Sequence, residues 1–195
     1  MTFDAGANAA GLMSILSTLD REGVTATFFL TGGFANQYPT SVQAIVAGGH
    51  RLGNHTATHP HLPLLSDAAI VSQLTQAESQ IRVAGGTDPR PLFRFPFGDR
   101  NAHTIAVVNG AGYVAVRWTV DTLGWKGTTL GGITAQIVVD RVVATASPGQ
   151  IVLMHVGSNP DDHTTLDADA LPTVIARLRS IGYGFVTLDA LLAAA

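Results

Sequence analysis

Short apolar runs alternate with stretches of helical periodicity along this chain. The strand-like runs are Met1–Phe3, Ala26–Thr31, Arg51–His55, Leu92–Phe95, Tyr113–Trp118, Ile151–His155 and Phe185–Leu188. The predicted helices lie at about Ala9–Glu22, Ser41–Ala47, Asp67–Val83, Ala102–Val108, Ile133–Ala146 and Ala168–Ile181, with a short apolar helix from Asp189 to the end. Strands that alternate with helices in this way predict a parallel sheet with helices outside it.

Local signals mark several helix ends. Thr40 and Gln43 have the spacing of a capping box, and Ser66 with Asp67 predicts a capped, acidic first turn. Gly85 and Gly86 are typical of a helix stop. The strand–helix units predict an α/β fold, a small distorted (β/α)7 barrel that is TIM-barrel-like, as one domain over residues 1–195. An open doubly wound sheet is the alternative, because periodicity alone does not choose between the two.

Composition narrows the class of protein. Hydrophobic residues make up 46% of the 195 residues and charged residues only 13%, which argues against disorder and against a coiled coil. The net charge of -3 gives no footprint for nucleic acid. Cysteine is absent, so any metal must be held by histidines and carboxylates. No apolar run reaches the ~18 residues of a membrane span, and oligomeric state is not readable.

The chain begins abruptly, because Met1 already lies inside an apparent strand. We therefore expect a trimmed N-terminus or a preceding segment. No signal peptide is recognisable in this sequence.

Polar, chemically capable side chains fall where predicted strands end. They are Asp4, His55, His59, Arg94, Asp121 and His155. Barrel enzymes assemble their sites on the face formed by the carboxyl ends of the strands. This placement favours the barrel over the open sheet and predicts one site.

The segment around His55 and His59 is the most informative. Histidines at positions i and i+4 lie on one face of a helical turn, so both imidazoles reach one cation. A loop with two polar residues is the alternative. Arg94 has apolar neighbours, and a guanidinium there needs a carboxylate partner because unpaired burial is costly.

Asp121 and His155 complete the set. A carboxylate can orient and charge a histidine, as a general acid requires. A turn aspartate and a structural histidine are the alternative. Trp125 and Leu153 are apolar groups beside them, for which packing in the core is equally open.

Taken together, these segments resemble the five ordered motifs of the polysaccharide deacetylase family (NodB homology, carbohydrate esterase family 4). The first motif, TFDD, matches Thr2-Phe3-Asp4 and departs at Ala5. The second, H(S/T)xxH, matches from His55 to His59 in full.

The remaining three motifs follow in the same order and extend the resemblance over nearly the whole chain. RxP(F/Y)G matches Arg94 to Gly98, and (I/L)VLxH matches Ile151 to His155. DxxDW keeps Asp121 and Trp125 but has Gly124 in place of its second aspartate. The resemblance implies a distorted (β/α) barrel and a divalent metal, most often Zn²⁺.

The resemblance also implies a role for each matched residue. His55 and His59 would bind the metal. Asp4 would be the general base for the attacking water, held by Arg94, and His155 would be the general acid.

For the rest of the site, the resemblance implies that Asp121 tunes His155. The backbone N–H of Phe97 would stabilise the oxyanion together with the metal. Trp125 and Leu153 would wall the pocket for the acetyl methyl group.

Ala5 stands where the family has a metal-binding aspartate, and a methyl group cannot ligate. Three arrangements are open. Asp4 itself moves onto the metal, which we favour and which leaves the base role to His155 or to the metal-bound water. Water fills the position, or a residue from elsewhere substitutes, with Asp161, Asp162 and His163 as candidates.

The resemblance implies a metal-dependent hydrolase that removes acetyl groups from N-acetylated or O-acetylated polysaccharide such as peptidoglycan or a chitin-like oligosaccharide. A catalytically weak carbohydrate-binding relative is the alternative that Ala5 supports. An amidase acting on small amides is a third, which the narrow pocket predicted at Trp125 and Leu153 argues against. The implied substrate places the protein outside the cell or on its surface.

Overall fold

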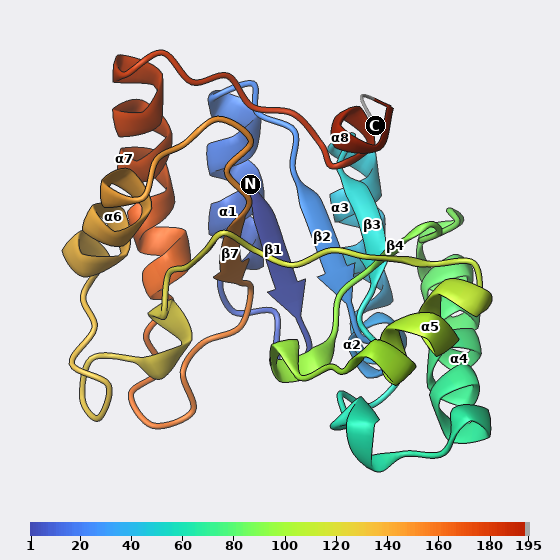
Figure 1. Cartoon of the computed structure of the whole chain (residues 1–195). Coiled ribbons are helices and arrows are strands. Elements are labelled where there is room, and N and C mark those ends of the chain that lie inside the picture. Colours follow the sequence, from blue (N-terminus) through green and yellow to red (C-terminus); the bar gives the residue numbers. More distant parts are fainter. Residues whose placement is uncertain (194–195) are drawn as a thin grey trace.

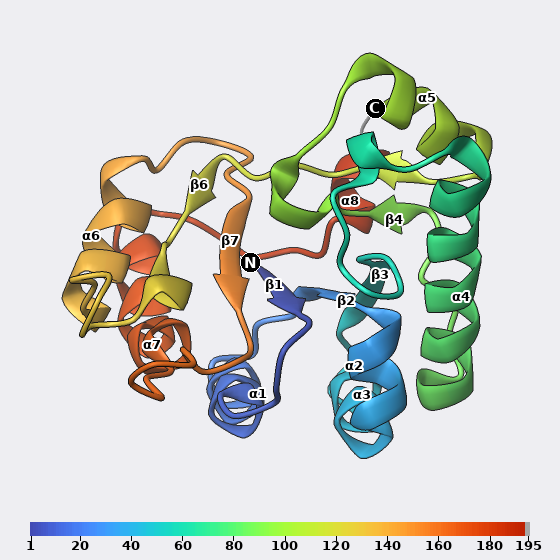
Figure 2. The ribbon, with the colours of Figure 1, turned by 90° about the horizontal axis from the view of Figure 1, so that it is seen from below.

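A computed structural model describes residues 1–193 and shows a curled, seven-stranded parallel sheet (Figures 1 and 2). The strands are β1 (Thr2–Ala5), β2 (Thr27–Leu30), β3 (Arg51–Asn54), β4 (Leu92–Phe93), β5 (Val114–Ala115), β6 (Val120–Asp121) and β7 (Val152–His155). Their order in the sheet is β5-β4-β3-β2-β1-β7-β6. The predicted distorted (β/α)7 barrel is therefore confirmed.

The barrel is open between its two edge strands, β5 and β6. Residues 116–119 connect these edges, so the chain passes across the sheet from one side to the other (Figure 1). Because β4, β5 and β6 have two residues each, pairing is weakest along this part of the wall.

Helices cover the outer side of the sheet. They are α1 (Leu12–Arg21), α2 (Gly32–Gln37), α3 (Pro39–Ala47), α4 (Asp67–Gly85), α5 (Ala102–Gly110), α6 (Ala135–Ala144), α7 (Leu166–Ser180) and α8 (Asp189–Ala193). Short 3-10 turns lie at η1 (Leu62–Leu64), η2 (Pro96–Gly98) and η3 (Gly124–Lys126). Within residues 1–193, no helix combines the length and the apolar character that crossing a bilayer requires.

Two of the helix-end predictions are confirmed and one is wrong. The hydroxyl of Ser66 accepts the backbone N–H of Ala69, and Gly86 ends α4 in the left-handed conformation, as predicted. The capping box at Thr40 is wrong, because α3 already begins at Pro39 and its N-cap, Tyr38, makes no side-chain cap. The part of the predicted C-terminal helix at residues 194–195 lies outside the described residues.

Alternation along the strands separates the core from the site. Phe3 and Ala5 on β1 point outward into the main apolar cluster, which α1, α6 and α7 complete. Asp4 lies between them and points the other way, and it is in register with His155 on β7. Paired residues on neighbouring strands project to the same face, so β1 and β7 deliver a carboxylate and an imidazole side by side.

One predicted element is wrong, and two elements were missed. Phe185–Leu188 forms no strand; Leu188 instead packs against Phe29 and Leu92 and donates its N–H to the Thr27 hydroxyl. Through Leu188, this segment therefore packs against one end of the barrel without adding a strand to the sheet. The strand β6 and the helix α2 were missed because each is too short to show a period.

Candidate active site

A pocket of about 640 Å³ opens at the carboxyl ends of the strands. It is lined by Asp4, Gly6, Ala7, His55, His59, Phe95, Phe97, Trp118, Asp121, Trp125, Leu153 and His155. Every residue predicted for the site lies on this wall except Arg94, which lies behind it. The fold thus gathers residues more than 150 positions apart in the sequence, Asp4 and His155, into one cavity.

Asp4 and Arg94 form a buried ion pair. The guanidinium Nη1 of Arg94 donates to Oδ1 of Asp4 at 2.7 Å, and the arginine side chain is fully buried. Burial alone would raise the pKa of Asp4, but Arg94, His55 and His155 together outweigh it and hold that pKa below its usual value. Asp4 is therefore a carboxylate at neutral pH.

The neighbours of Arg94 explain how a guanidinium tolerates this position. Its Cζ lies 4.1 Å from the ring centroid of Phe29 and 5.7 Å from that of Trp118. A Cβ at Gly53 would lie 2.6 Å from the Phe29 ring, so only glycine leaves this ring its place. The predicted need of Arg94 for a carboxylate is confirmed, whereas the role of Trp118 was missed because it ends an apolar run that resembled a core strand.

His55 and His59 come together without a helical turn. The segment between them is irregular, with positive φ at Thr56 (69°) and His59 (61°), so the predicted helical geometry is wrong. The Thr56 hydroxyl accepts the N–H of His59, and Oε1 of Gln73 accepts the N–H groups of Ala57 and Thr58. The two imidazole centroids nevertheless lie 4.8 Å apart.

The histidine pair has the chemistry of metal ligands. Nδ1 of His55 lies 2.8 Å from the Arg94 carbonyl oxygen; a carbonyl only accepts, so Nδ1 donates and Nε2 stays free. Burial lowers the pKa of His55, and burial with the adjacent His55 lowers that of His59 to about 4. Both rings are thus neutral, as metal ligands must be.

The third potential metal ligand is the carboxylate of Asp4. Oδ2 of Asp4 lies 3.4 Å from Nε2 of His55, which places a carboxylate beside the imidazole nitrogen that is free. Across the described part of the chain, no group of three or more potential ligands has the geometry of a preassembled site. The donor set of two imidazoles and one carboxylate fits a divalent metal in its chemistry.

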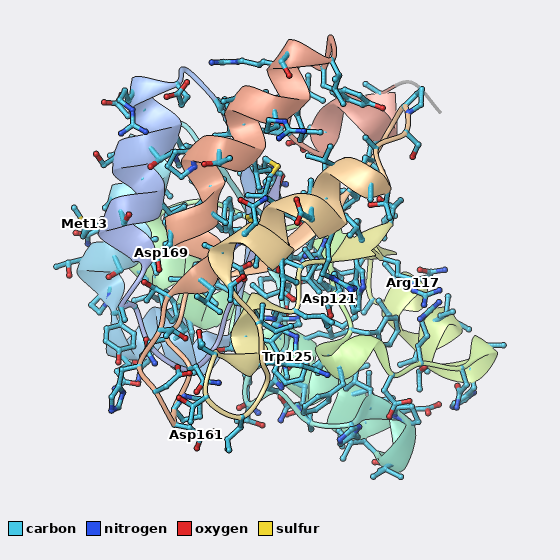
Figure 3. The ribbon with its side chains drawn as sticks, turned by 90° about the vertical axis from the view of Figure 1, so that its left-hand side faces the viewer. Met13, Arg117, Asp121, Trp125, Asp161 and Asp169 are labelled. Atoms are coloured by element: carbon cyan, nitrogen blue, oxygen red, sulfur yellow. The ribbon has the colours of Figure 1, made fainter. Side chains whose placement is uncertain are left out.

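The alternative third ligands lie elsewhere. Asp161, Asp162 and His163 do not line the pocket, and Asp162 accepts the N–H groups of Thr128 and Thr129 instead. Figure 3 shows Asp161 at the outer end of the loop that follows β7. Ala5 is fully buried in the main apolar cluster.

Phe97 forms part of the rim in a strained conformation. Its φ is 58°, a left-handed value that is unusual for a bulky residue. Its ring packs edge-on against His59, with centroids 4.5 Å apart, and stacks on His61 at 4.1 Å. Of the five non-glycine residues with positive φ in the described chain, His59 and Phe97 line the pocket and Thr56 is next to His55, a placement typical of functional sites.

On the other side of the pocket, His155 meets a carboxylate that the sequence did not predict. Its backbone N–H donates to Oδ2 of Asp167 at 2.8 Å, and its Nδ1 lies 3.7 Å from the same oxygen. Asp121 lines the pocket, but its Oδ1 accepts the N–H of Leu123, and no ion pair joins it to His155 in residues 1–193. Asp167 was missed because it lies inside the helix α7, outside every recognised motif.

Charges around His155 favour its protonated form. Burial opposes the imidazolium, but Asp167, Asp4 and Asp121 outweigh burial and raise the pKa of His155 above its usual value. Trp125 lies beside it, with ring centroids 6.4 Å apart. One pocket therefore holds an ionised carboxylate at Asp4 and a histidine at 155 that favours carrying a proton.

Comparisons with known proteins agree with this geometry. The family described as polysaccharide deacetylase matches residues 1–116. A peptidoglycan-N-acetylglucosamine deacetylase of Bacillus cereus is 32% identical over 191 residues, which cover 98% of this chain and 66% of that protein. A chitooligosaccharide deacetylase of Sinorhizobium fredii is 34% identical over 178 residues, covering 91% of this chain and 80% of that protein.

A solved structure shows the same architecture. A family 4 carbohydrate esterase pseudoenzyme from Bacillus anthracis superposes with a TM-score of 0.85 at 30% identity, over 98% of this chain and 65% of that one. This chain thus spans about two thirds of the length of that protein and of the Bacillus cereus relative. The matched family, the identities and the shared fold agree, and the chain belongs to the polysaccharide deacetylase family.

Proposed function

We propose that this chain is a metal-dependent hydrolase that removes acetyl groups from an N-acetylated polysaccharide such as peptidoglycan or a chitin-like oligosaccharide. The observation that carries the proposal is the register of Asp4 with His155, which sets a carboxylate and an imidazole side by side in one pocket. Hydrolysis of an amide needs a base for water and an acid for the leaving amine.

Asp4 is suited to take a proton from the attacking water. Its carboxylate is ionised, and the bond from Arg94 at 2.7 Å fixes one oxygen while the other faces the pocket beside His55. A base held in this way loses little entropy when the substrate binds. The second possible role of Asp4, as a metal ligand, uses the same free oxygen.

His155 is suited to give a proton to the leaving amine. The negative charges around it favour the imidazolium, and its side chain remains 29% exposed toward the pocket. In the reaction, His155 passes its proton to the sugar nitrogen as the carbon–nitrogen bond breaks. The products are acetate and a free amine.

The apolar wall is suited to hold the acetyl methyl group. Leu153 is buried one alternation below His155 on β7, and Trp125 stands over the opening, 47% exposed. Phe97 offers its backbone N–H as an oxyanion donor. Because Trp125 and Phe97 project aromatic faces at the rim, a sugar ring can pack there as well.

His55, His59 and Asp4 would hold the metal, which we take to be Zn²⁺. When bound, it would polarise the carbonyl and lower the pKa of water. The substrate implied by the relatives' names would place the protein at or beyond the cell surface.

Acetate release from chitooligosaccharide and from peptidoglycan tests the proposal. The protein is stripped with a chelator and assayed with and without added zinc. Zinc-dependent release from either polymer supports a deacetylase and sinks the carbohydrate-binding alternative. Sugar binding with no release under any metal supports that alternative instead.

A further inference from the structure

We infer that Asp167, on the first turn of α7, is the positioning residue of His155 and occupies the space that Gly124 leaves free. Asp167 is 3% exposed and lies directly behind the imidazole, with Oδ2 3.7 Å from Nδ1. The inference rests on the proposed function only for its kinetic readout.

Asp167 is a buried carboxylate without a cationic side chain of its own. Its Oδ2 accepts the backbone N–H of His155, and its Oδ1 is buried with no hydrogen-bond partner. Among the described residues, no lysine or arginine lies within 4 Å of it, and His155 makes the one ion-pair contact. A buried charge without a partner is costly, so the Asp167 carboxylate needs a cation beside it. Protonated His155 can supply that cation.

His155, like Asp167, has a buried polar atom without a hydrogen bond. Its Nδ1 is buried and has no hydrogen-bond partner, although it faces the carboxylate. Hydrogen bonds within a site are often long in the free enzyme and shorten when substrate binds. Closing the 3.7 Å gap to Oδ2 would give Nδ1 its missing partner, hold Nδ1 as the proton donor toward Asp167 and leave Nε2 for the pocket.

Gly124 shows why the carboxylate comes from α7. A Cβ built on Gly124 would lie 2.4 Å from Oδ1 of Asp167 and 2.6 Å from its carboxyl carbon. A side chain at position 124 and the carboxylate of Asp167 would therefore occupy the same space. This chain has glycine where the fourth motif has its second aspartate, so a carboxylate reaches the same place from another element.

The test compares four forms of the full chain: wild type, Asp167→Ala, Asp167→Ala with Gly124→Asp, and Asp169→Ala. Asp169 is the matched control, because it lies on the same first turn of α7 but is exposed (Figure 3). Acetate release gives kcat and KM, and thermal unfolding confirms that each variant folds.

We expect Asp167→Ala to lower kcat by about 10²-fold, the lower end of what a positioned acid contributes, with little change in KM. Adding Gly124→Asp should restore kcat to within a few-fold of wild type, since it returns a carboxylate to the same space. Asp169→Ala should behave as wild type. A purely structural role for Asp167 would lower stability, with no rescue of kcat from position 124.

A second readout does not depend on activity. Nitrogen-15 NMR of the ring reports which nitrogen of neutral His155 carries the proton. We expect Nδ1 in the wild type, Nε2 in Asp167→Ala and Nδ1 again in the double variant. If wild type releases no acetate, the proposed function fails while this readout still decides the inference.

Three results would overturn the inference. They are an unchanged kcat in folded Asp167→Ala, a folded double variant whose kcat is not restored, and the same His155 ring tautomer in all forms.

Discussion

Two corners of the pocket both hold buried ionisable side chains, but they pair these side chains in different ways. In the Asp4 corner (Asp4, His55 and Arg94), the Asp4 and His55 side chains are 8% and 4% exposed and each has a defined partner, while Nη2 of Arg94 is buried without a hydrogen bond. In the His155 corner (Asp121, Trp125, His155 and Asp167), His155 is 29% exposed, and it and Asp167 keep buried atoms without hydrogen bonds. In the second corner, His155 ends the four-residue strand β7, whereas Asp121 ends β6, which has two residues.

This difference indicates that the two corners contribute differently to stability and chemistry. A buried ion pair depends on both of its partners, so breaking the Asp4–Arg94 pair should lower the stability of the protein as well as its activity. An incompletely paired group can change its proton without disrupting the fold. The His155 corner should therefore affect rate more than stability.

Arg94→Met should have the largest effect. It leaves the buried carboxylate of Asp4 without its cation, and we expect the free energy of unfolding to fall by about 3–5 kcal/mol, with loss of activity. Chemical denaturation measures the change. Arg179→Met, which alters an exposed arginine, is the control. A loss below about 1 kcal/mol would remove the distinction between the corners.

His155→Asn should have a large effect on rate alone. We expect kcat to fall by about 10²–10⁴-fold, because the proposed general acid is lost. Its free energy of unfolding should fall less than in Arg94→Met, since the backbone N–H of residue 155 still donates to Asp167 and the Asn amide can donate in place of Nδ1. A loss of stability as large as that of Arg94→Met would contradict this prediction.

Ala5→Asp should strengthen metal binding. Ala5 is the last residue of β1 and its methyl group faces the apolar cluster, but it precedes Gly6, which lines the pocket, so an aspartate there reaches His55 and His59 only by turning at the strand end. We expect tighter zinc binding by calorimetry and, without metal, a lower melting temperature from the buried carboxylate. Unchanged zinc affinity would mean that the wild-type site already has its full set of ligands.

Tyr113→Phe should have the smallest effect and concerns the support of the Asp4 corner. The Tyr113 hydroxyl accepts from Nδ2 of Asn54, whose Oδ1 accepts the N–H of Thr56 beside His55. Burial raises the pKa of Tyr113 to about 12. The unfolded chain deprotonates near pH 10 while the folded protein keeps its proton, so this contribution to stability is complete below about pH 10 and is lost as pH rises toward 12.

Denaturation at several pH values from 8 upward measures this loss of stability. The alkaline decline should be weaker in Tyr113→Phe than in wild type. Tyr183→Phe, outside this network, should keep the wild-type decline. Equal declines in all three proteins would rule out Tyr113 as its source.

The two corners also differ in how far the sequence predicted them. Arg94 among apolar residues predicted a buried ion pair, because only a carboxylate makes that position tolerable, and Asp4 supplies it. Asp121 was predicted to be the partner of His155 from the order of the motifs, which gives no distance between the two side chains. Asp167 could not be found in this way, since only the packing of α7 against β7 and η3 brings it to His155.

The same reasoning separates the fold predictions that succeeded from those that failed. Buried strands with alternating faces, such as β1 and β7, show a clear pattern in the sequence. The segment Phe185–Leu188 has an equally apolar pattern but closes one end of the barrel, a tertiary role that local periodicity does not distinguish from a strand.

A double-mutant cycle of Asp4→Asn and His155→Asn tests whether the two corners act on one bond, as we propose. Acetate release gives kcat/KM for wild type, both single variants and the double variant, all with zinc. We predict that each single variant loses most of the activity and that the double variant is little worse than either, as for groups that act as a unit. Wild-type rates in either single variant, or losses that multiply in the double variant, would contradict the account.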